Sequence, residues 1–572
     1  MGKRRRARKV QKEAPSSRPG TQASLLPPLT VPSSSQRISL GLILFLGLVL
    51  RLAYLLEYRA KSIFYSQLML DAQVYEDWAR RIAGGEWLGG GVFYHAPLYP
   101  YVLALLFKVF GIRYLPIYLL QMLLGLGVLL LAYRIGRGCA SVWIGLAAAG
   151  LLVFYAPLPF FETKVMSTSV ALFLSTLALA VLVEAWERGG ALTWLAAGGL
   201  IGITALANPA SLLLAPCYAA GLLLRRRRWQ EVGALAAGAI LAVAPATLHN
   251  LAQGGGFVPI SSQGGITFYQ GNSPNSRGLY RAADGFSGSP LTQMQEEKAL
   301  AEKEVGHPLR ASEISSFWFG KGVRVISAQP GAALSLLQMK LFRWFSSIEY
   351  STEYSQSIER GEVATLWIPI LPFGFLAVGG VAGIILGYRA YPRLMPVFLY
   401  LAGAVAPPMI FYVSSRYRLP AAPALAVLTA TALERIVARF RSRGILDALP
   451  AILIILIASG LTLAPIGRDH LFQNANVHYN AGNLFYDRGE YDAAIDQYRQ
   501  ALQVSDFEYY RINLGNALTR KQRYDEAVEQ YRLASQKRPT FAKSYIQWAK
   551  TLALQGKLDE ARSIYQRAVE LK

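Results

Sequence analysis

The sequence is poor in cysteine and in charge. Only two of its 572 residues are cysteines, Cys139 and Cys217. Cys139 falls in a short loop and Cys217 in an apolar run, so neither a disulfide framework nor a cysteine-based metal site is supported. Charged residues make up 16% of the chain and hydrophobic residues 53%, with a mean hydropathy of +0.29. This composition is too apolar for one soluble domain.

Acidic residues are also scarce beside basic ones, 35 against 58, which gives a formal charge of +23. The basic residues gather in short clusters between long apolar runs, as in the four arginines at residues 225–228. Such clusters mark the cytoplasmic loops of membrane proteins. We therefore expect a membrane partner and no nucleic acid.

The apolar runs predict a mainly α, polytopic membrane bundle over residues 38–466, because runs of roughly 20 apolar residues are long enough to cross a bilayer. The alternation of runs and basic clusters gives about eleven spans, with external loops at about 58–114 and 249–362. Residues 1–37 are basic and then rich in Pro and Ser, which predicts a disordered cytoplasmic tail. The apolar run at residues 97–110 is short and has two prolines among its first four residues, so we expect it to lie along the outer surface.

A repeat begins near Val477, where the composition becomes charged and rich in Tyr and Ala. The recurring residues, at offsets of 33 and then 34, are Gly482, Ala494, Tyr498 and Ala501; Gly515, Ala527, Tyr531 and Ala534; and Ala549, Ala561, Tyr565 and Ala568. Small residues and tyrosines at this period are typical of tetratricopeptide repeats. We expect three soluble α-helical units over 477–572, outside the cytoplasm. They either bind a protein partner or simply pack together.

Three carboxylates follow the first apolar run, Asp71, Glu76 and Asp77. Ionised groups are costly close to hydrocarbon and usually mark a site there. The alternative is an ordinary solvated loop. The motif His-Ala-Pro-Leu-Tyr-Pro follows at residues 95–100.

Several further motifs occur in a fixed order along the membrane part. They are Gly84 and Gly85 after the acidic loop, Glu162 at the opening of a span, Asn208 with Pro209, His249 with Asn250, Gly264 and Gly265 leading to Gly271 and Asn272, and Arg416-Tyr417-Arg418-Leu419-Pro420. Together with Asp71, Tyr75 and His95, this order resembles the bacterial GT-C glycosyltransferases related to protein O-mannosyltransferases and lipid A aminoarabinose transferases (glycosyltransferase family 39-like). The resemblance covers roughly residues 38–465. Ala72 departs from it, because the family commonly has Asp-Glu at this point, and Ala96 is a second departure.

The resemblance implies sugar transfer from a polyprenyl-phosphate donor to a protein, lipid or glycan acceptor at the extracytoplasmic face of the cell inner or plasma membrane, with inversion at the anomeric carbon. It implies that Asp71 is the catalytic base, since transfer to a hydroxyl needs a carboxylate near the acceptor proton. Glu162 would be a second catalytic carboxylate, which orients the acceptor or helps to hold a divalent cation. The alternative for Glu162 is an ion pair with Lys164. No ligand spacing identifies a metal.

The remaining candidates are substrate-binding residues. Arg416 and Arg418 could bind the lipid phosphate, because arginine offers a bidentate fork, or could anchor a span end at the interface. His95 could contact the phosphate or sugar. Glu76, or else Asp77, could replace the second acidic residue of the family's Asp-Glu pair, which is Ala72 here. Further candidates are Tyr75, Tyr99 and Trp78 for the sugar or isoprenoid, and Asn272 and Arg277 for the acceptor.

Two other functions remain open. A lipid-linked glycan ligase or polymerase would take a preassembled glycan as its donor. A non-enzymatic scaffold or transporter would present the repeats as an arm. A transporter is expected to carry charged or broken spans near the midplane, whereas the acids here cluster at one membrane face.

Overall fold

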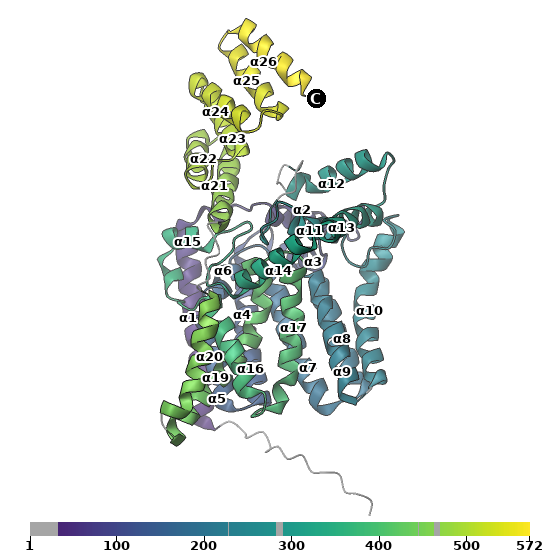
Figure 1. The fold of residues 1–572 in the computed structure, drawn as a ribbon, viewed down its shortest axis with the longest axis vertical. Coiled ribbons are helices and arrows are strands. Elements are labelled where there is room, and N and C mark those ends of the chain that lie inside the picture. The colour runs from purple at the N-terminus through teal and green to yellow at the C-terminus, as the bar shows by residue number, and fades with distance from the viewer. Residues whose placement is uncertain are drawn as a thin grey trace, which may run out of the picture.

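The computed structural model describes residues 33–226, 228–281, 286, 290–443, 445–462 and 469–571. Within these residues the chain is almost entirely helical and contains no strand beyond one isolated bridge between Tyr155 and Leu371. Most of the predicted tail at residues 1–37 lies outside the described residues. Figure 1 shows a bundle of roughly parallel helices, a layer of shorter helices at one end, and a helical arm that projects beyond that layer.

Eleven helices form the bundle. They are α1 (Ser34–Lys61), α4 (Leu115–Cys139), α5 (Val142–Val153), α7 (Thr168–Arg188), α8 (Ala191–Ala205), α9 (Leu214–Arg226), α10 (Trp229–Ala252), α16 (Phe373–Gly387), α17 (Met395–Ile410), α19 (Ala422–Arg443) and α20 (Ile445–Thr462). Six described segments are long and apolar enough to cross a membrane by themselves. Large apolar side chains such as Phe45 on α1 and Leu241 on α10 are exposed, as expected where helices face lipid. The predicted fold class, a multi-pass helical membrane protein, is confirmed.

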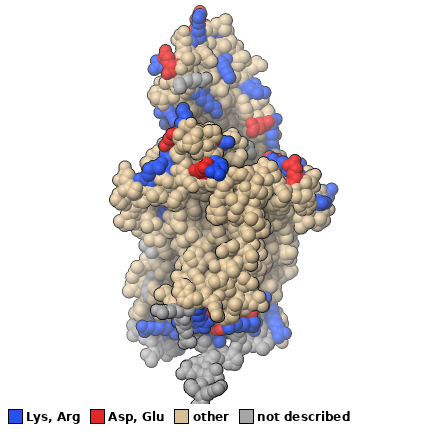
Figure 2. All heavy atoms as spheres, turned by 90° about the vertical axis from the view of Figure 1, so that its right-hand side faces the viewer, with Lys and Arg blue, Asp and Glu red and all other residues tan. Residues whose placement is uncertain are grey.

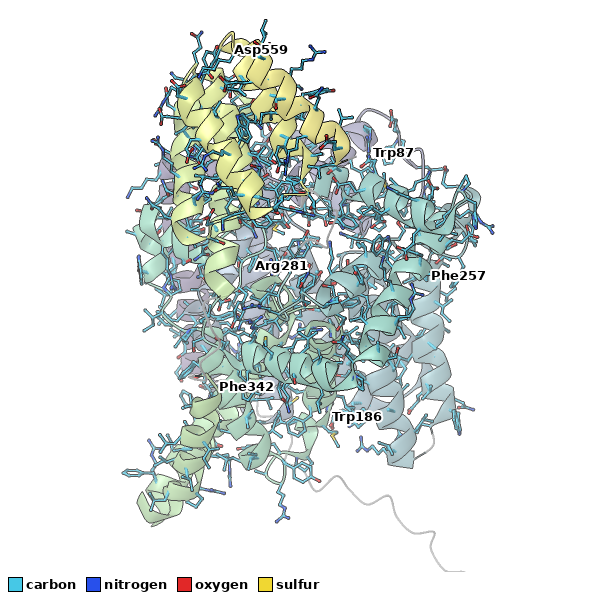
Figure 3. The ribbon with its side chains drawn as sticks, turned by 45° about the horizontal axis from the view of Figure 1, so that its top comes forward. Trp87, Trp186, Phe257, Arg281, Phe342 and Asp559 are labelled. Atoms are coloured by element: carbon cyan, nitrogen blue, oxygen red, sulfur yellow. The ribbon has the colours of Figure 1, made fainter. Side chains whose placement is uncertain are left out.

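The charged side chains are segregated along the long axis. On the face drawn in Figure 2, a wide band nearly free of Lys, Arg, Asp and Glu separates two charged ends, and basic residues predominate at the end opposite the arm. In Figure 3, Trp186 on α7 lies toward that basic end and Asp559 lies at the far end of the arm. The apolar band is the part of the surface that suits hydrocarbon.

Glycines allow neighbouring bundle helices to approach closely. A Cβ at Gly198 of α8 would lie 2.0 Å from the backbone oxygen of Leu235 on α10, and one at Gly383 of α16 would lie 1.9 Å from that of Leu428 on α19. Small residues at such crossings are the usual means by which membrane helices pack.

The layer at the arm end holds the short helices. They are α2 (Asp71–Ala83), α3 (Leu98–Phe110), α6 (Pro157–Glu162), α11 (Gly264–Asn272), α12 (Pro290–Val305), α13 (Ala311–Ala328), α14 (Pro330–Phe345), α15 (Gln356–Glu362) and α18 (Ser415–Arg418). Short 3₁₀ turns lie at Ile63–Tyr65, Pro209–Leu213, Ala364–Trp367, Pro392–Leu394 and Leu419–Ala421. Helix α3 packs against α2, and its place along the outer surface stays a prediction.

The arm consists of three helix pairs, α21 (Asp469–Asp487) with α22 (Tyr491–Val504), α23 (Glu508–Arg520) with α24 (Tyr524–Lys537), and α25 (Ala542–Leu554) with α26 (Leu558–Glu570). A Cβ at Gly482 would lie 2.5 Å from the ring of Tyr498, and one at Gly515 would lie 2.6 Å from the ring of Tyr531. The recurring glycines therefore make room for the recurring tyrosines, and the predicted repeat fold is confirmed.

Candidate active site

Three charged side chains from distant parts of the chain meet at the arm end of the bundle. Arg416 of α18 places Nη1 3.1 Å from Oδ2 of Asp71 and 3.2 Å from Oε1 of Glu353. Asp71 and Glu353 are both buried. The sequence predicted Asp71 and Arg416 as site residues but not Glu353, which lies between α14 and α15.

The backbone just before Asp71 has an unusual conformation. Leu70 has a φ of +51°, a region that residues with a Cβ rarely adopt. The backbone N–H of the preceding Met69 donates to the hydroxyl of Tyr354, one residue after Glu353. The loop that carries Glu353 thus also holds the turn that begins α2. Backbone strain of this kind clusters at functional sites.

The two carboxyl groups have opposite pKa shifts. Burial alone would raise the pKa of Asp71, but the charge of Arg416, with contributions from His95 and a hydrogen bond from Glu353, brings it below its ordinary value. Burial and the neighbouring Asp71 charge raise the pKa of Glu353 well above its ordinary value. Two close carboxyls do not both ionise. The two shifts therefore favour a proton on Glu353 over one on Asp71.

Aromatic residues and a histidine enclose Asp71. Tyr75, one turn further along α2, packs edge-on against Tyr99 and His95, with ring centroids 5.4 Å and 5.8 Å apart. Burial lowers the pKa of His95, so its imidazole is neutral at neutral pH. The hydroxyl of Tyr99 donates to Gln121. The structure thus brings together five predicted residues, Asp71, Tyr75, His95, Tyr99 and Arg416.

The Glu76 side chain contacts residues outside the cluster of Asp71, Arg416 and Glu353. It forms an ion pair with Arg80 at 2.6 Å and accepts a hydrogen bond from the hydroxyl of Tyr114. Glu76 therefore ties α2 to the residue before α4. Asp77 is exposed, and Trp78 packs against Phe93 with ring centroids 5.4 Å apart.

Glu162 is paired with an arginine from inside the first span. Arg51 of α1 donates through Nε and Nη2 to both oxygens of Glu162, at 2.7 Å and 2.9 Å, and both side chains are buried. Lys164 pairs instead with Glu359, at 2.7 Å. The alternative interpretation of Glu162, an ion pair with Lys164, is therefore wrong. Although Lys164 is close to Glu162 in sequence, the partner of Glu162 is Arg51 of α1, which forms two hydrogen bonds with its carboxylate.

The side chains of Arg418 and Asn272 hydrogen-bond to other groups of the protein. Arg418 is fully buried, donates to the backbone oxygens of Ser346 and Ile348, and pairs with Glu349 at 2.9 Å. The amide of Asn272 donates to the backbone oxygens of Phe268 and Ile410 and accepts from Lys340. Arg277 is exposed.

Sequence reasoning missed two residues that organise this region. Arg51 did carry a signal, since a charged residue inside an apolar run is rare and usually paired. Glu353 carried none, because it is one of several acids in a long loop without a motif. As to a cation site, the described part of the chain holds no group of three or more His, Cys, Asp or Glu residues with suitable geometry.

Comparison with protein families supports the predicted resemblance. Residues 94–249 match the family described as dolichyl-phosphate-mannose-protein mannosyltransferase. Residues 479–540 and 542–572 match tetratricopeptide repeat families. A comparison with curated protein sequences finds no match.

Solved structures resemble this chain only distantly. The oligosaccharyltransferase of Archaeoglobus fulgidus in the apo form is 16% identical with a TM-score of 0.43, covering 76% of this chain and 57% of that one. The same organism's AglB, in complex with an inhibitory peptide and a dolichol-phosphate, is 15% identical with a TM-score of 0.40, covering 80% and 59%. ArnT from Cupriavidus metallidurans bound to undecaprenyl phosphate is 14% identical with a TM-score of 0.39, covering 88% and 80%. The chain spans a little over half the length of the oligosaccharyltransferases. At these TM-scores none of the likenesses carries an argument about the site.

Proposed function

We propose that this GT-C-like chain is an integral membrane glycosyltransferase that moves a sugar from a polyprenyl-phosphate donor to a hydroxyl acceptor. The observation that carries the proposal is the cluster of Asp71, Arg416 and Glu353, a buried ionised carboxylate beside a cation at one end of a membrane bundle. Burying an ionised carboxylate is costly, and such a group close to hydrocarbon usually marks a site.

The chemistry assigns Asp71 as the general base. Its carboxylate takes the proton of the acceptor hydroxyl while the acceptor oxygen bonds to the anomeric carbon of the sugar. The bond from that carbon to the phosphate oxygen breaks, and its electron pair leaves with the polyprenyl phosphate. Because attack and departure occur on opposite faces, the anomeric configuration inverts.

Arg416 is the proposed phosphate ligand. Its Nη1 serves both carboxyls, whereas its buried Nε has no hydrogen-bond partner among the described residues. A buried N–H donor without a partner is costly, and a phosphate oxygen would satisfy it. With Glu353 protonated, Arg416 faces one ionised carboxylate and the cluster is formally neutral, whereas a second ionised carboxylate would make it negative and repel the donor phosphate.

The other predicted residues fall into two groups. His95, Tyr75 and Tyr99 lie around Asp71 and form the proposed sugar-binding wall. Glu162, Glu76, Asn272 and Arg418 are proposed as positioning residues, because each is engaged by protein partners. We assign the direct contacts with the substrates to Asp71 and Arg416, which also pair with each other.

The orientation follows from charge. Lys and Arg predominate at the end of the bundle opposite the arm (Figure 2), and basic segments stay in the cytoplasm. This supports a cytoplasmic N-terminus in a cell inner or plasma membrane. The site and the tetratricopeptide arm would then face the extracytoplasmic side, where the arm recruits a protein.

Replacing Arg416 by glutamine should raise the KM for the polyprenyl-phosphate sugar about 10- to 100-fold, because a charge-assisted contact to phosphate contributes about 1.5–3 kcal/mol. Steady-state kinetics with the protein in lipid nanodiscs measure this. Arg113, an exposed arginine between α3 and α4, provides the matched control, and Arg113→Gln should leave KM unchanged. Equal KM values for the Arg416 variant and the native chain would remove Arg416 from the donor site.

The rate should also depend on pH through both carboxyls. Activity needs an ionised Asp71 and a protonated Glu353, so it should be lost in acid only below the ordinary Asp pKa of 3.8. It should be lost in alkali as pH rises through the raised pKa of Glu353. In Glu353→Gln, whose amide stays neutral, the alkaline loss should disappear from the profile of kcat/KM against pH. An unchanged alkaline limb would show that Glu353 does not titrate in the working enzyme.

A further inference from the structure

Three consecutive buried residues between α14 and α15 contact different parts of the protein. The first belongs to the carboxyl cluster, which consists of Asp71, Arg416 and Glu353. The hydroxyl of the second, Tyr354, accepts from the backbone N–H of Met69, in the turn before α2. The third, Ser355, is the N-cap of α15. The position of the Glu353 carboxyl therefore depends on how this segment is held.

Ser355 is hydrogen-bonded to the arm. Its hydroxyl donates to Oδ1 of Asn474 at 2.8 Å, and the hydroxyl of Ser357 donates to the same oxygen at 3.5 Å. Asn474 lies on α21, the first helix of the arm. The Ser355 hydroxyl also accepts from the backbone N–H of Ile358 and so caps α15. One hydroxyl thus orients the beginning of α15 and connects it to the arm.

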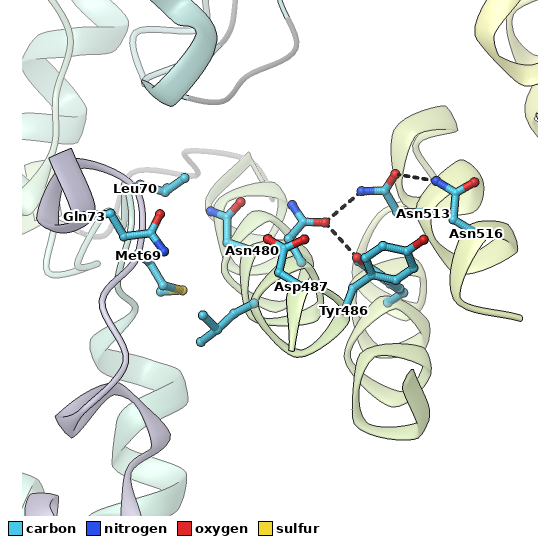
Figure 4. A pocket seen from close by; sticks show the side chains of 11 residues that line it. Met69, Leu70, Gln73, Asn480, Tyr486, Asp487, Asn513 and Asn516 are labelled. Atoms are coloured by element: carbon cyan, nitrogen blue, oxygen red, sulfur yellow. Dashed lines mark hydrogen bonds between the residues drawn. The ribbon is translucent and has the colours of Figure 1, made fainter. Parts of the chain in front are cut away.

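The base of the arm is fixed to the membrane domain at α21. Ala481 and Leu484 of this helix pack against the hydrophobic core of that domain. Near the turn before α2, a cavity of about 290 Å³ separates Leu70 from Asn480 of α21 (Figure 4). Helix α21 therefore approaches this turn without filling the space beside it, whereas the contact at Asn474 is direct.

The middle of α15 is anchored in the membrane domain by charge. Lys164 pairs with Glu359 of α15 at 2.7 Å, and both side chains are buried. Tyr54 of α1 donates a hydrogen bond to the same carboxylate. The short helix is therefore held by the membrane domain at Glu359 and by the arm at Ser355. Loss of the second contact would release the end of α15 that adjoins Glu353.

The protonation of Glu353 is sensitive to its position. Burial and the charge of Asp71 raise the pKa of Glu353, and the charge of Arg416 lowers it. Three phenols with raised pKa values also interact with Glu353 and stay neutral at neutral pH, namely those of Tyr75, Tyr280 and Tyr354. If Glu353 moved away from Asp71 and toward water, both causes of its raised pKa would weaken, so its pKa would fall.

We propose that Asn474 of the arm is a positioning residue of the active site, which holds Glu353 in the carboxyl cluster through its hydrogen bond with Ser355. The inference rests on the proposed function and deepens it, because it makes the arm part of the support of the cluster. A change in the orientation of α21 would therefore change the rate of sugar transfer.

The test follows the protonation of Glu353 in the full chain in nanodiscs, by infrared difference spectroscopy as a function of pH. The carboxyl band that is absent from Glu353→Gln belongs to Glu353. In Asn474→Ala this band should disappear at a lower pH than in the native chain. Asn474→Asp keeps an oxygen that accepts from Ser355, so its band should persist to at least the native pH.

Asn476 provides the matched control, because it lies on the same helix and accepts a hydrogen bond from Tyr510 within the arm, at 2.6 Å. Asn476→Ala should leave the titration of the band unchanged. An unchanged titration in Asn474→Ala, or an equal shift in Asn476→Ala, would overturn the inference.

Sugar transfer provides a second measurement. In Asn474→Ala, kcat/KM at neutral pH should fall about 2- to 10-fold, the loss expected when one hydrogen bond no longer holds a positioned group. A native kcat/KM in this variant would show that the contact does not serve the reaction. Absence of transfer by the native chain would contradict the proposed function, whereas the infrared titration would still decide whether Asn474 holds Glu353.

Discussion

Sugar transfer should fall by about 10²- to 10⁴-fold when Asp71 is replaced by asparagine, the loss expected on removing a general base. The amide keeps the size of the side chain and can still accept a hydrogen bond from Arg416, so the fold should persist. The measurement is single-turnover transfer from a polyprenyl-phosphate sugar, with thermal unfolding recorded on the same sample.

Asp77 provides the control for that experiment, because it lies on the same helix and is exposed. Asp77→Asn should transfer sugar at the native rate. Native turnover in the Asp71 variant would exclude Asp71 as the base. A variant that is inactive and also unfolds early would point to a structural role instead.

The largest stability effect should follow the loss of Arg51. In Arg51→Leu, the Glu162 carboxylate stays buried without its bidentate partner, which should lower the free energy of unfolding by about 3–5 kcal/mol. The site is crowded as well, since a Cβ at Gly125 would lie 1.8 Å from Oε1 of Glu162. Unfolding in detergent, followed by tryptophan fluorescence, measures the change.

A double variant makes this prediction specific. Replacing both partners, Arg51→Leu with Glu162→Leu, removes the uncompensated charge and should recover most of the lost stability. The control is Lys61→Leu, which removes an exposed ion pair with Glu57 on the same helix. It should lower the free energy of unfolding by only about 0–1 kcal/mol. If the single variant is as stable as the native chain, or the double variant is worse than the single, the pair does not stabilise the fold in this way.

The sequence predicted the fold well for physical reasons. Lipid forces backbone groups to pair within helices, so apolar runs and basic clusters locate the bundle directly. The repeats were visible because Gly482 and Gly515 must be small where Tyr498 and Tyr531 pack. Both constraints act between residues close in sequence, so they produce regular patterns of apolar, basic and small residues along the chain.

The site was predictable only in part. Asp71 and Tyr75 lie one turn apart on α2, and His95 and Tyr99 belong to one motif, so local patterns found them. Glu353 reaches Asp71 only through the fold of the long segment between α10 and α16. The partner of Glu162 could not be predicted for the same reason, since Arg51 comes from a different helix.

Sugar transfer from a polyprenyl-phosphate donor by a site that contains Asp71 and Arg416 is tested most directly with the purified chain in nanodiscs. The chain is incubated with radiolabelled polyprenyl-phosphate monosaccharides, with and without a peptide that contains Ser and Thr. We expect the native chain to release sugar from one such donor, leaving polyprenyl phosphate, and Asp71→Asn not to do so. Release at equal rates by both proteins, or use of a preassembled lipid-linked glycan alone, would contradict it.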